Sequence, residues 1–117
     1  MGERMAVQVK RGEFLDVAVT WKNNTSTMLT LALFALIGQA DSADPYNIFK
    51  FTAELGFMSD LITIAPNEQR TDELLFQVPP DCSTGIKDVC VIAGGTDEEG
   101  NIIPVAYEIQ LDILEIL

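Results

Sequence analysis

The stretch FLDVAVTWK, from Phe14 to Lys22, alternates between two kinds of position over its whole length. Its larger apolar residues fall on one side of the alternation: Leu15, Val17, Val19 and Trp21. Two residues is the side-chain period of a β-strand, and such alternation indicates a strand with one buried face. We therefore predict that this segment is a strand whose apolar side faces the core.

Comparable segments lie on both sides of this stretch. The predicted strands are Met5–Lys10, Ile48–Phe57, Leu61–Ala65, Thr71–Val78, Ile86–Ala93 and Pro104–Leu117. Clusters of Gly, Pro, Asn, Asp and Ser separate them, as in tight turns. Short strands at this spacing predict an all-β protein of seven to eight strands, built as one domain over residues 1–117.

The segment MLTLALFALI, from Met28 to Ile37, is apolar on both faces, so its periodicity does not separate a strand from a buried helix. Its Leu and Ala content favours a helix, whereas its place between strand-like segments favours a central strand. We predict a strand, and a helix is the alternative. In a two-layer fold, the side that carries Phe34 and Leu36 then needs a cover, either the insert at residues 39–57 or another subunit.

Three motifs point to a known fold family. The first is Val17–Thr25, which indicates a strand followed by Asn and a turn. The second is Ile64–Glu68, a proline turn that precedes the inward-facing strand Leu74–Pro79. The third is Gly85–Val91, a strand that starts at a glycine. In these features the chain resembles immunoglobulin-like domains of the CARDB type, from about Val7 to Leu111.

The resemblance implies an immunoglobulin-like antiparallel β-sandwich. Domains of this kind mostly serve adhesion, assembly, spacing or ligand presentation, and they share no catalytic residues. The chain departs from the pattern in the long insert at residues 39–57 and in the extended loop at residues 82–84.

Charge and composition exclude several classes of function. The chain has 18 acidic and 7 basic residues, so its formal net charge is -11. Binding to DNA or RNA relies on Lys and Arg that neutralise phosphates, so we predict no nucleic-acid partner. The chain has no histidine, which removes the commonest general acid–base and the usual catalytic triads. We predict that the protein is not an enzyme and holds no cofactor.

Two further features bear on metals and redox state. The loop Asp97–Asn101 offers the oxygen ligands that calcium prefers, yet it lacks the alternating spacing of a calcium loop. We interpret it as a solvated hairpin tip and assign no metal site, with calcium as the alternative. Cys82 and Cys90 are too close in sequence for the disulfide that joins the sheets of an immunoglobulin domain, so free thiols are expected.

The beginning of the chain shows no signal-peptide pattern, and no apolar run is long enough to cross a bilayer as a helix. We predict no membrane insertion, and we expect a cytoplasmic or virion-associated protein or a domain cut from a longer one.

The C-terminus is apolar where a free end is normally polar, and an uncovered strand edge invites pairing. An end paired within the domain is the alternative. The candidate interface comprises Phe34, Leu36, Phe49, Phe51, Leu114, Ile116 and Leu117.

These features predict a non-enzymatic structural or interaction module, a subunit or accessory protein of a larger assembly such as a virion or surface layer. It would associate with itself or dock on a partner protein. The alternative is a carbohydrate-binding module that uses the aromatic stretch from Tyr46 to Phe57, since aromatic faces stack on sugars.

Overall fold

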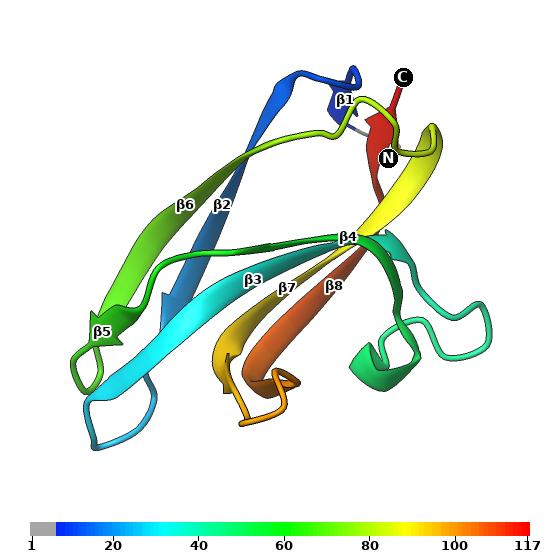
Figure 1. Ribbon diagram of the computed structural model, residues 1–117. Coiled ribbons are helices and arrows are strands. Elements are labelled where there is room, and N and C mark those ends of the chain that lie inside the picture. Colours follow the sequence, from blue (N-terminus) through cyan, green and yellow to red (C-terminus); the bar gives the residue numbers. More distant parts are fainter. Residues whose placement is uncertain (1–6) are drawn as a thin grey trace, which may run out of the picture.

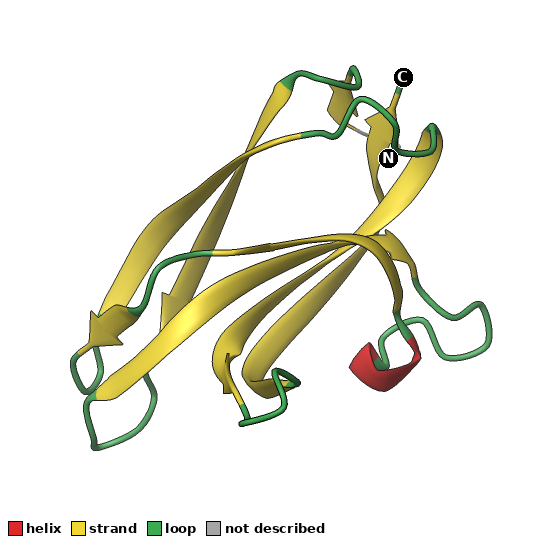
Figure 2. Cartoon of the chain, viewed as in Figure 1, coloured by secondary structure: helices red, strands yellow, loops and turns green. Residues whose placement is uncertain are grey.

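Strands make up most of the chain in a computed structural model, which describes residues 7–117 (Figures 1 and 2). The strands are β1 (Val7–Val9), β2 (Phe14–Lys22), β3 (Leu29–Gln39), β4 (Thr52–Met58), β5 (Ile62–Ile64), β6 (Gln69–Gln77), β7 (Gly85–Thr96) and β8 (Ile102–Ile116). A single 3-10 turn, η1, spans Ile48–Lys50 in the described part of the chain. The predicted all-β class is confirmed, and the helical alternative for Met28–Ile37 is wrong. Met5, the predicted start of the first strand, lies outside the described residues.

The strands form two sheets of unequal size. The larger sheet has the order β1-β8-β7-β3-β4, with β5 beside β3, and the smaller one contains only β2 and β6. β1 runs parallel to β8, whereas the other paired strands are antiparallel. The larger sheet is therefore mixed and differs from the purely antiparallel arrangement that we expected. In Figure 1 the β2–β6 pair lies apart from the curled larger sheet, and β1 lies at the same end as the C-terminus.

The main core lies between the two sheets and is supplied by alternate residues of each strand. From β3 it takes Leu31, Leu33, Ala35 and Ile37, and from the end of the chain Leu114 and Ile116. Leu74, Phe76 and Val78 are buried in it, as the alternation in Thr71–Val78 predicts. Burial of a large apolar side chain contributes about 1.5–3 kcal/mol, so this layer supplies most of the driving force for folding.

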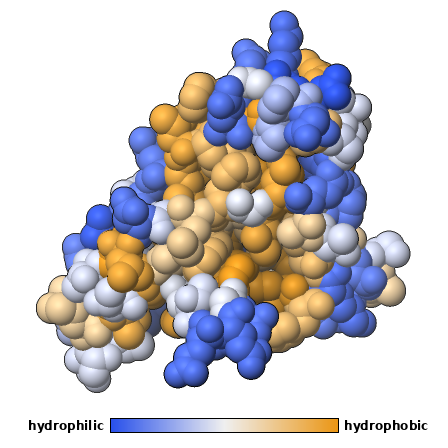
Figure 3. Space-filling model, in the orientation of Figure 1, coloured by the Kyte–Doolittle hydropathy of each residue, from blue (hydrophilic) through white to orange (hydrophobic). Residues whose placement is uncertain are grey.

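A second apolar cluster covers the opposite face of the larger sheet. Phe34, Cys90 and Ile92 are buried there, and residues of the 39–57 insert, including Ile48 and Phe51, pack on them. The insert thus supplies the cover that the two-sided apolar strand requires. On the face shown in Figure 3, apolar side chains occupy the centre and hydrophilic ones gather toward the periphery.

A buried carboxylate fixes both the start of the insert and a bend in β8. The two oxygens of Asp88 accept hydrogen bonds from the backbone N–H groups of Ala40 and Asp112, each 2.7 Å long. Asp112 has a φ of 51°, and the β7–β8 register shifts between Lys87 and Val89. This irregularity moves the following side chains to the other face of the sheet.

The bend changes which face of β8 is buried. Ile109 and Leu111 pack on the outer cluster, whereas Ile113 packs on the core between the sheets and Tyr107 is exposed. The alternation from Tyr107 to Ile113 therefore does not correspond to one buried face, because the phase changes at Asp112.

Asn23, the residue after β2, joins three segments from inside the fold. Its side-chain amide donates to the carbonyls of Thr27, Ile64 and Ala65, and its side-chain oxygen accepts from the N–H and hydroxyl of Thr25. Its side chain is 1% exposed, so these bonds replace water almost completely. The turn at residues 23–26 is thereby tied to β5.

We expect Asn23→Ala to lower the free energy of unfolding by about 3 kcal/mol, because it removes a buried amide together with the hydrogen bonds that this amide makes to Thr25, Thr27 and β5. Urea denaturation measures this loss. Asn24→Ala, at an exposed neighbouring position, is the matched control and should change stability by less than about 0.5 kcal/mol. Equal effects of the two substitutions would contradict this account of the turn.

Candidate functional site

The predicted interface residues lie in three different environments. Phe34, Leu36 and Phe51 belong to the outer cluster under the insert. Leu114 and Ile116 are 2% and 1% exposed and lie in the core between the sheets. Phe49 and Leu117 are exposed. The structure does not bring this set together as one surface.

The end of the chain is covered from within. Leu114 pairs with Val7 of β1 and with Lys87 of β7, and Ile116 pairs with Val9 and Gly85. The backbone N–H of Leu117 donates to the carbonyl of Val9. The end of β8 is therefore paired on both edges within the domain. This is the alternative to a C-terminus that pairs with another chain.

The aromatic stretch from Tyr46 to Phe57 does not form one platform. Tyr46 and Phe49 are exposed, at 63% and 84%, whereas Phe51 packs in the outer cluster. Phe57 faces the other side of the sheet and stacks on Phe76, with ring centroids 3.6 Å apart. The predicted strand Ile48–Phe57 begins only at Thr52, because η1 occupies its first residues.

The acidic hairpin Asp97–Asn101 is held by its own carboxylate. The oxygens of Asp97 accept from the backbone N–H groups of Glu99 and Asn101 and from the side-chain amide of Asn101. These bonds lower the pKa of Asp97, the bond to the backbone of Asn101 most of all. The Asp97 carboxylate thus stabilises the hairpin turn through these hydrogen bonds. In residues 7–117 no three His, Cys, Asp or Glu side chains form a group that suits a metal ion.

An ion pair with a buried lysine, which no sequence pattern indicated, lies at one end of the molecule. The Lys87 side chain, 4% exposed, donates from Nζ to both oxygens of Glu54, at 2.8 and 3.0 Å, and to the hydroxyl of Ser83. Ser83 also donates to Glu54. Hydrogen bonds from Lys87 and then Ser83 lower the pKa of Glu54. The three residues come from β7, β4 and the β6–β7 loop, so sequence spacing gives no signal of their contact.

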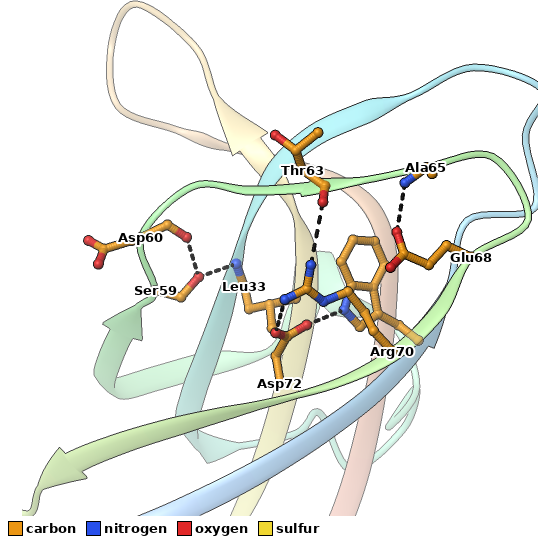
Figure 4. Close-up of polar contacts among 9 residues, drawn as sticks. Leu33, Ser59, Asp60, Thr63, Ala65, Glu68, Arg70 and Asp72 are labelled. Atoms are coloured by element: carbon orange, nitrogen blue, oxygen red, sulfur yellow. Dashed lines mark hydrogen bonds and ion pairs between the residues drawn. The ribbon is translucent and has the colours of Figure 1, made fainter.

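A second polar group lies at the opposite end, between the sheets. Arg70 and Asp72 point inward from β6, and the guanidinium bonds to the Asp72 carboxylate at 2.8 Å and to the carbonyl of Thr63 at 3.4 Å (Figure 4). The other carboxylate oxygen accepts from the indole N–H of Trp21 at 3.0 Å. Asp72 therefore fixes the orientation of Trp21 on β2.

An open groove runs along one side of the molecule between β2 and β8. Three adjoining hollows follow one another along β2, with volumes of about 130, 80 and 200 Å³. Their apolar walls include Val17 and Val19 of β2 and Val89 and Val91 of β7. The inward side chains of β2 are only half-buried, whereas Leu74 and Phe76 of its neighbour β6 are buried, because β2 borders the open side.

The groove carries acidic side chains at its rim. Asp16 and Glu108 are the charged residues that line the three hollows, and no basic residue of the described chain lines them. The opposite side, between the two sheets, is closed by the stacked rings of Phe57 and Phe76. The groove is thus a one-sided opening with a negative rim, and its interior is mainly apolar in the two outer hollows and more polar in the middle one.

The end of the molecule that holds the β1–β2 turn carries two exposed cations. Lys10 and Arg11 form no ion pair among residues 7–117, whereas Lys50, Arg70 and Lys87 each pair with a carboxylate. The turn is held in place by Gly12, with φ of 87°, whose N–H donates to the carbonyl of Val78 at 2.8 Å. Over residues 7–117, no helix reaches the length and apolarity that a membrane crossing requires.

Comparison with solved structures finds a likeness to a DNA-bound enzyme. The fold resembles part of the Pseudomonas fluorescens alkylpurine DNA glycosylase AlkC, solved in complex with DNA containing an abasic site analogue, with a TM-score of 0.57 and 13% sequence identity. The matched region covers 93% of this chain and 27% of the AlkC chain. No protein-family model and no curated protein sequence matches the chain. At this identity the likeness establishes a shared fold, and DNA binding and base excision are properties of AlkC.

The likeness to AlkC corrects two interpretations drawn from the sequence. A structural module of a virion or surface layer, with carbohydrate binding as the alternative, is contradicted because the matching fold is part of a DNA-bound enzyme. The exclusion of nucleic acid is contradicted by the same finding. Net charge sums over the whole surface, so it does not decide what one local group of side chains contacts.

The Lys87–Glu54 ion pair predicts a pH dependence of stability. A lowered pKa in the folded state means that the contribution of Glu54 is fully present above its ordinary pKa of 4.5 and is lost as the pH falls through the lowered value. We expect Glu54→Gln to reduce stability at pH 7 and to flatten the acid side of the stability curve, as measured by thermal unfolding from pH 7 to 3. Glu98→Gln, on an exposed hairpin residue, is the control. A parallel curve for Glu54→Gln would contradict the assignment.

The two free thiols should differ in reactivity. Burial raises the pKa of Cys90 to about 11, and its side chain is 0% exposed, whereas Cys82 is half-buried in a loop. Since the thiolate is the reactive form, we expect a thiol reagent at pH 8 to modify one cysteine rapidly in the native protein and both after unfolding. In Cys82→Ser the rapid phase should disappear, and its persistence would show that Cys90 is accessible.

Proposed function

We propose that the chain is an immunoglobulin-like accessory domain that contributes contacts with DNA in a DNA-acting protein. The observation that supports this most is the likeness over 93% of the chain to part of a DNA glycosylase bound to DNA. The match covers only 27% of that enzyme. We therefore expect this chain to contribute to DNA contact and not to carry out base excision.

The strand order supports the immunoglobulin-like part of the proposal. In such domains strands B and E belong to one sheet, and strands C, F and G form the other. Here β2 and β6 take the places of B and E, and β3, β7 and β8 take those of C, F and G. The buried Asn23 directly after β2 is also consistent with the CARDB-type motif.

The β1–β2 turn is the end of the molecule best suited to meet phosphates. Lys10 and Arg11 are exposed there and form no ion pair within residues 7–117, so we expect them to neutralise two phosphate groups. Glu13 lies in the same turn, where its carboxylate accepts from the N–H of Lys10. With a net charge of -11, the contact is weak and strongly dependent on salt.

The chain is proposed to take no part in bond cleavage. It has no histidine, and the Lys87–Glu54–Ser83 group is closed by its own hydrogen bonds. Such a group stabilises the end of the sandwich and leaves no free base or nucleophile at a surface.

Fluorescence anisotropy with a labelled DNA duplex tests the proposal. At 20–50 mM salt we expect weak binding, with a dissociation constant on the order of 10⁻⁴ M, and a slope of log affinity against log salt of about -2 for two phosphate contacts. The same duplex with an abasic-site analogue shows whether damage is recognised.

Charge reversal at the turn supplies the decisive comparison. Lys10→Glu with Arg11→Glu should abolish binding, whereas Lys22→Glu with Lys50→Glu makes the same change in net charge away from the turn and should weaken it only slightly. Equal effects of the two double variants would exclude the turn. The absence of any binding at 20 mM salt and 0.5 mM protein, roughly five times the expected dissociation constant, would overturn the proposed function.

A further inference from the structure

We propose that the groove between β2 and β8 is a strand-addition site for an extended polypeptide segment that has apolar residues at alternate positions and basic residues between them. The segment would pair with the free edge of β2 and place its apolar side chains in the three hollows. This site is separate from the β1–β2 turn, so it does not depend on the proposed contact with DNA.

The backbone of β2 provides the first argument. β2 pairs with β6 on one edge only, and within residues 7–117 no strand occupies its other edge. Residues from both faces of β2 line the hollows, including Val17 and Val19 and the outward Ala18 and Thr20. The strand backbone therefore forms a wall of the groove. An unpaired edge of this length presents a row of N–H and C=O groups, which an extended segment satisfies.

The spacing of the hollows provides the second argument. Along β2, the first lies at Leu15–Val17, the second at Val17–Thr20 and the third at Val19–Trp21, so each is displaced from the last by about two residues. Successive side chains on one face of a neighbouring strand have this same spacing. Three successive side chains on one face of an added strand would therefore enter the three hollows.

The opposite wall is also incomplete. β8 pairs with β1 only over Leu114–Ile116, and its earlier residues Ala106 and Glu108 are exposed beside the groove. Val91 on the groove floor is half-buried, whereas Ala93 and Val89 on the same face of β7 are buried. An added strand would cover this floor.

Charge decides which occupant fits. Asp16 lies on the β2 wall and Glu108 on the β8 wall, and both side chains are exposed. Basic residues of an added strand would meet these carboxylates, whereas the phosphates of a nucleic-acid strand would be repelled by them. The groove and the β1–β2 turn are thus suited to different partners.

Trp21 is the only tryptophan of the chain and lines the third hollow, so its fluorescence reports on the groove. The probe is a blocked nine-residue peptide in which valine alternates with lysine and threonine. We expect a saturable change of tryptophan emission, with a dissociation constant between about 10⁻⁶ and 10⁻⁴ M. A peptide of the same composition in scrambled order should not bind, because its apolar residues do not share a face.

Backbone pairing is tested by methylating alternate backbone nitrogens of the peptide. Methylation of the odd-numbered nitrogens blocks one edge of the extended peptide, and methylation of the even-numbered ones blocks the other edge. One of these two peptides should lose binding, since the peptide pairs with β2 through only one of its edges. Retention of full affinity in both frames would overturn strand addition.

A charge exchange tests the assigned occupant. Glu108→Lys should weaken binding of the lysine peptide by about fivefold and strengthen binding of a peptide with glutamate in place of lysine. Glu73→Lys, on the exposed outer face of β6, is the matched control and should leave both affinities nearly unchanged. Equal effects of the two variants would overturn the charge assignment.

Three other experimental results would show that a different molecule or segment occupies the groove. A sedimentation profile in which the peptide dissociates a dimer would identify a second copy of the chain. Peptide binding that occurs only after removal of residues 1–6 would identify the chain's own first residues. A change of tryptophan emission with oligothymidine at 150 mM salt would identify nucleic acid. Each of these results overturns the proposal, and none depends on the outcome of the duplex titration.

Discussion

The fold depends on one constraint, which is that β3 is apolar on both faces. Leu31, Leu33 and Ile37 face the smaller sheet, and Phe34 faces the other way. A strand with one apolar face needs other elements of the fold to pack on that face only, but β3 needs packing partners on both faces. The β2–β6 pair supplies the inner cover and the 39–57 insert supplies the outer one. Gly38 permits this arrangement, because a Cβ there would collide with the carbonyl of Thr52 where the insert returns to the sheet.

The unequal size of the two sheets explains why the surface is not uniform. A two-stranded sheet cannot cover the whole inner face of a larger curled one, so one side stays open between β2 and β8. The other side is closed by the Phe57–Phe76 stack. Charge is uneven as well, because Asp16 and Glu108 border the groove while Lys10 and Arg11 occupy the β1–β2 turn. The net charge therefore does not describe the surface of any one side or end, since partners respond to local fields.

Polar interactions inside the molecule fix its irregular parts. Asn23 ties the turn after β2 to β5, Asp88 holds the bend at Asp112, and Lys87 and Glu54 join β7 to β4. Each buried group has partners from distant segments, which offsets the cost of its removal from water. A sequence pattern detects none of these contacts except the local one between Asn23 and Thr25, because the partners are brought together only by folding.

The sequence by itself determined the all-β class, the positions of β2 and β6 and the burial of Leu74, Phe76 and Val78, because a two-residue period is a local property of the chain. The central place of β3 also followed from its apolar composition and its neighbours. Only the tertiary structure decided that β1 pairs parallel with β8, that the phase of β8 changes at Asp112, and that the aromatic residues Phe51 and Phe57 lie on opposite faces of one sheet. These features, like the groove, depend on which strands become neighbours, and strand pairing is fixed by contacts between residues far apart in the sequence.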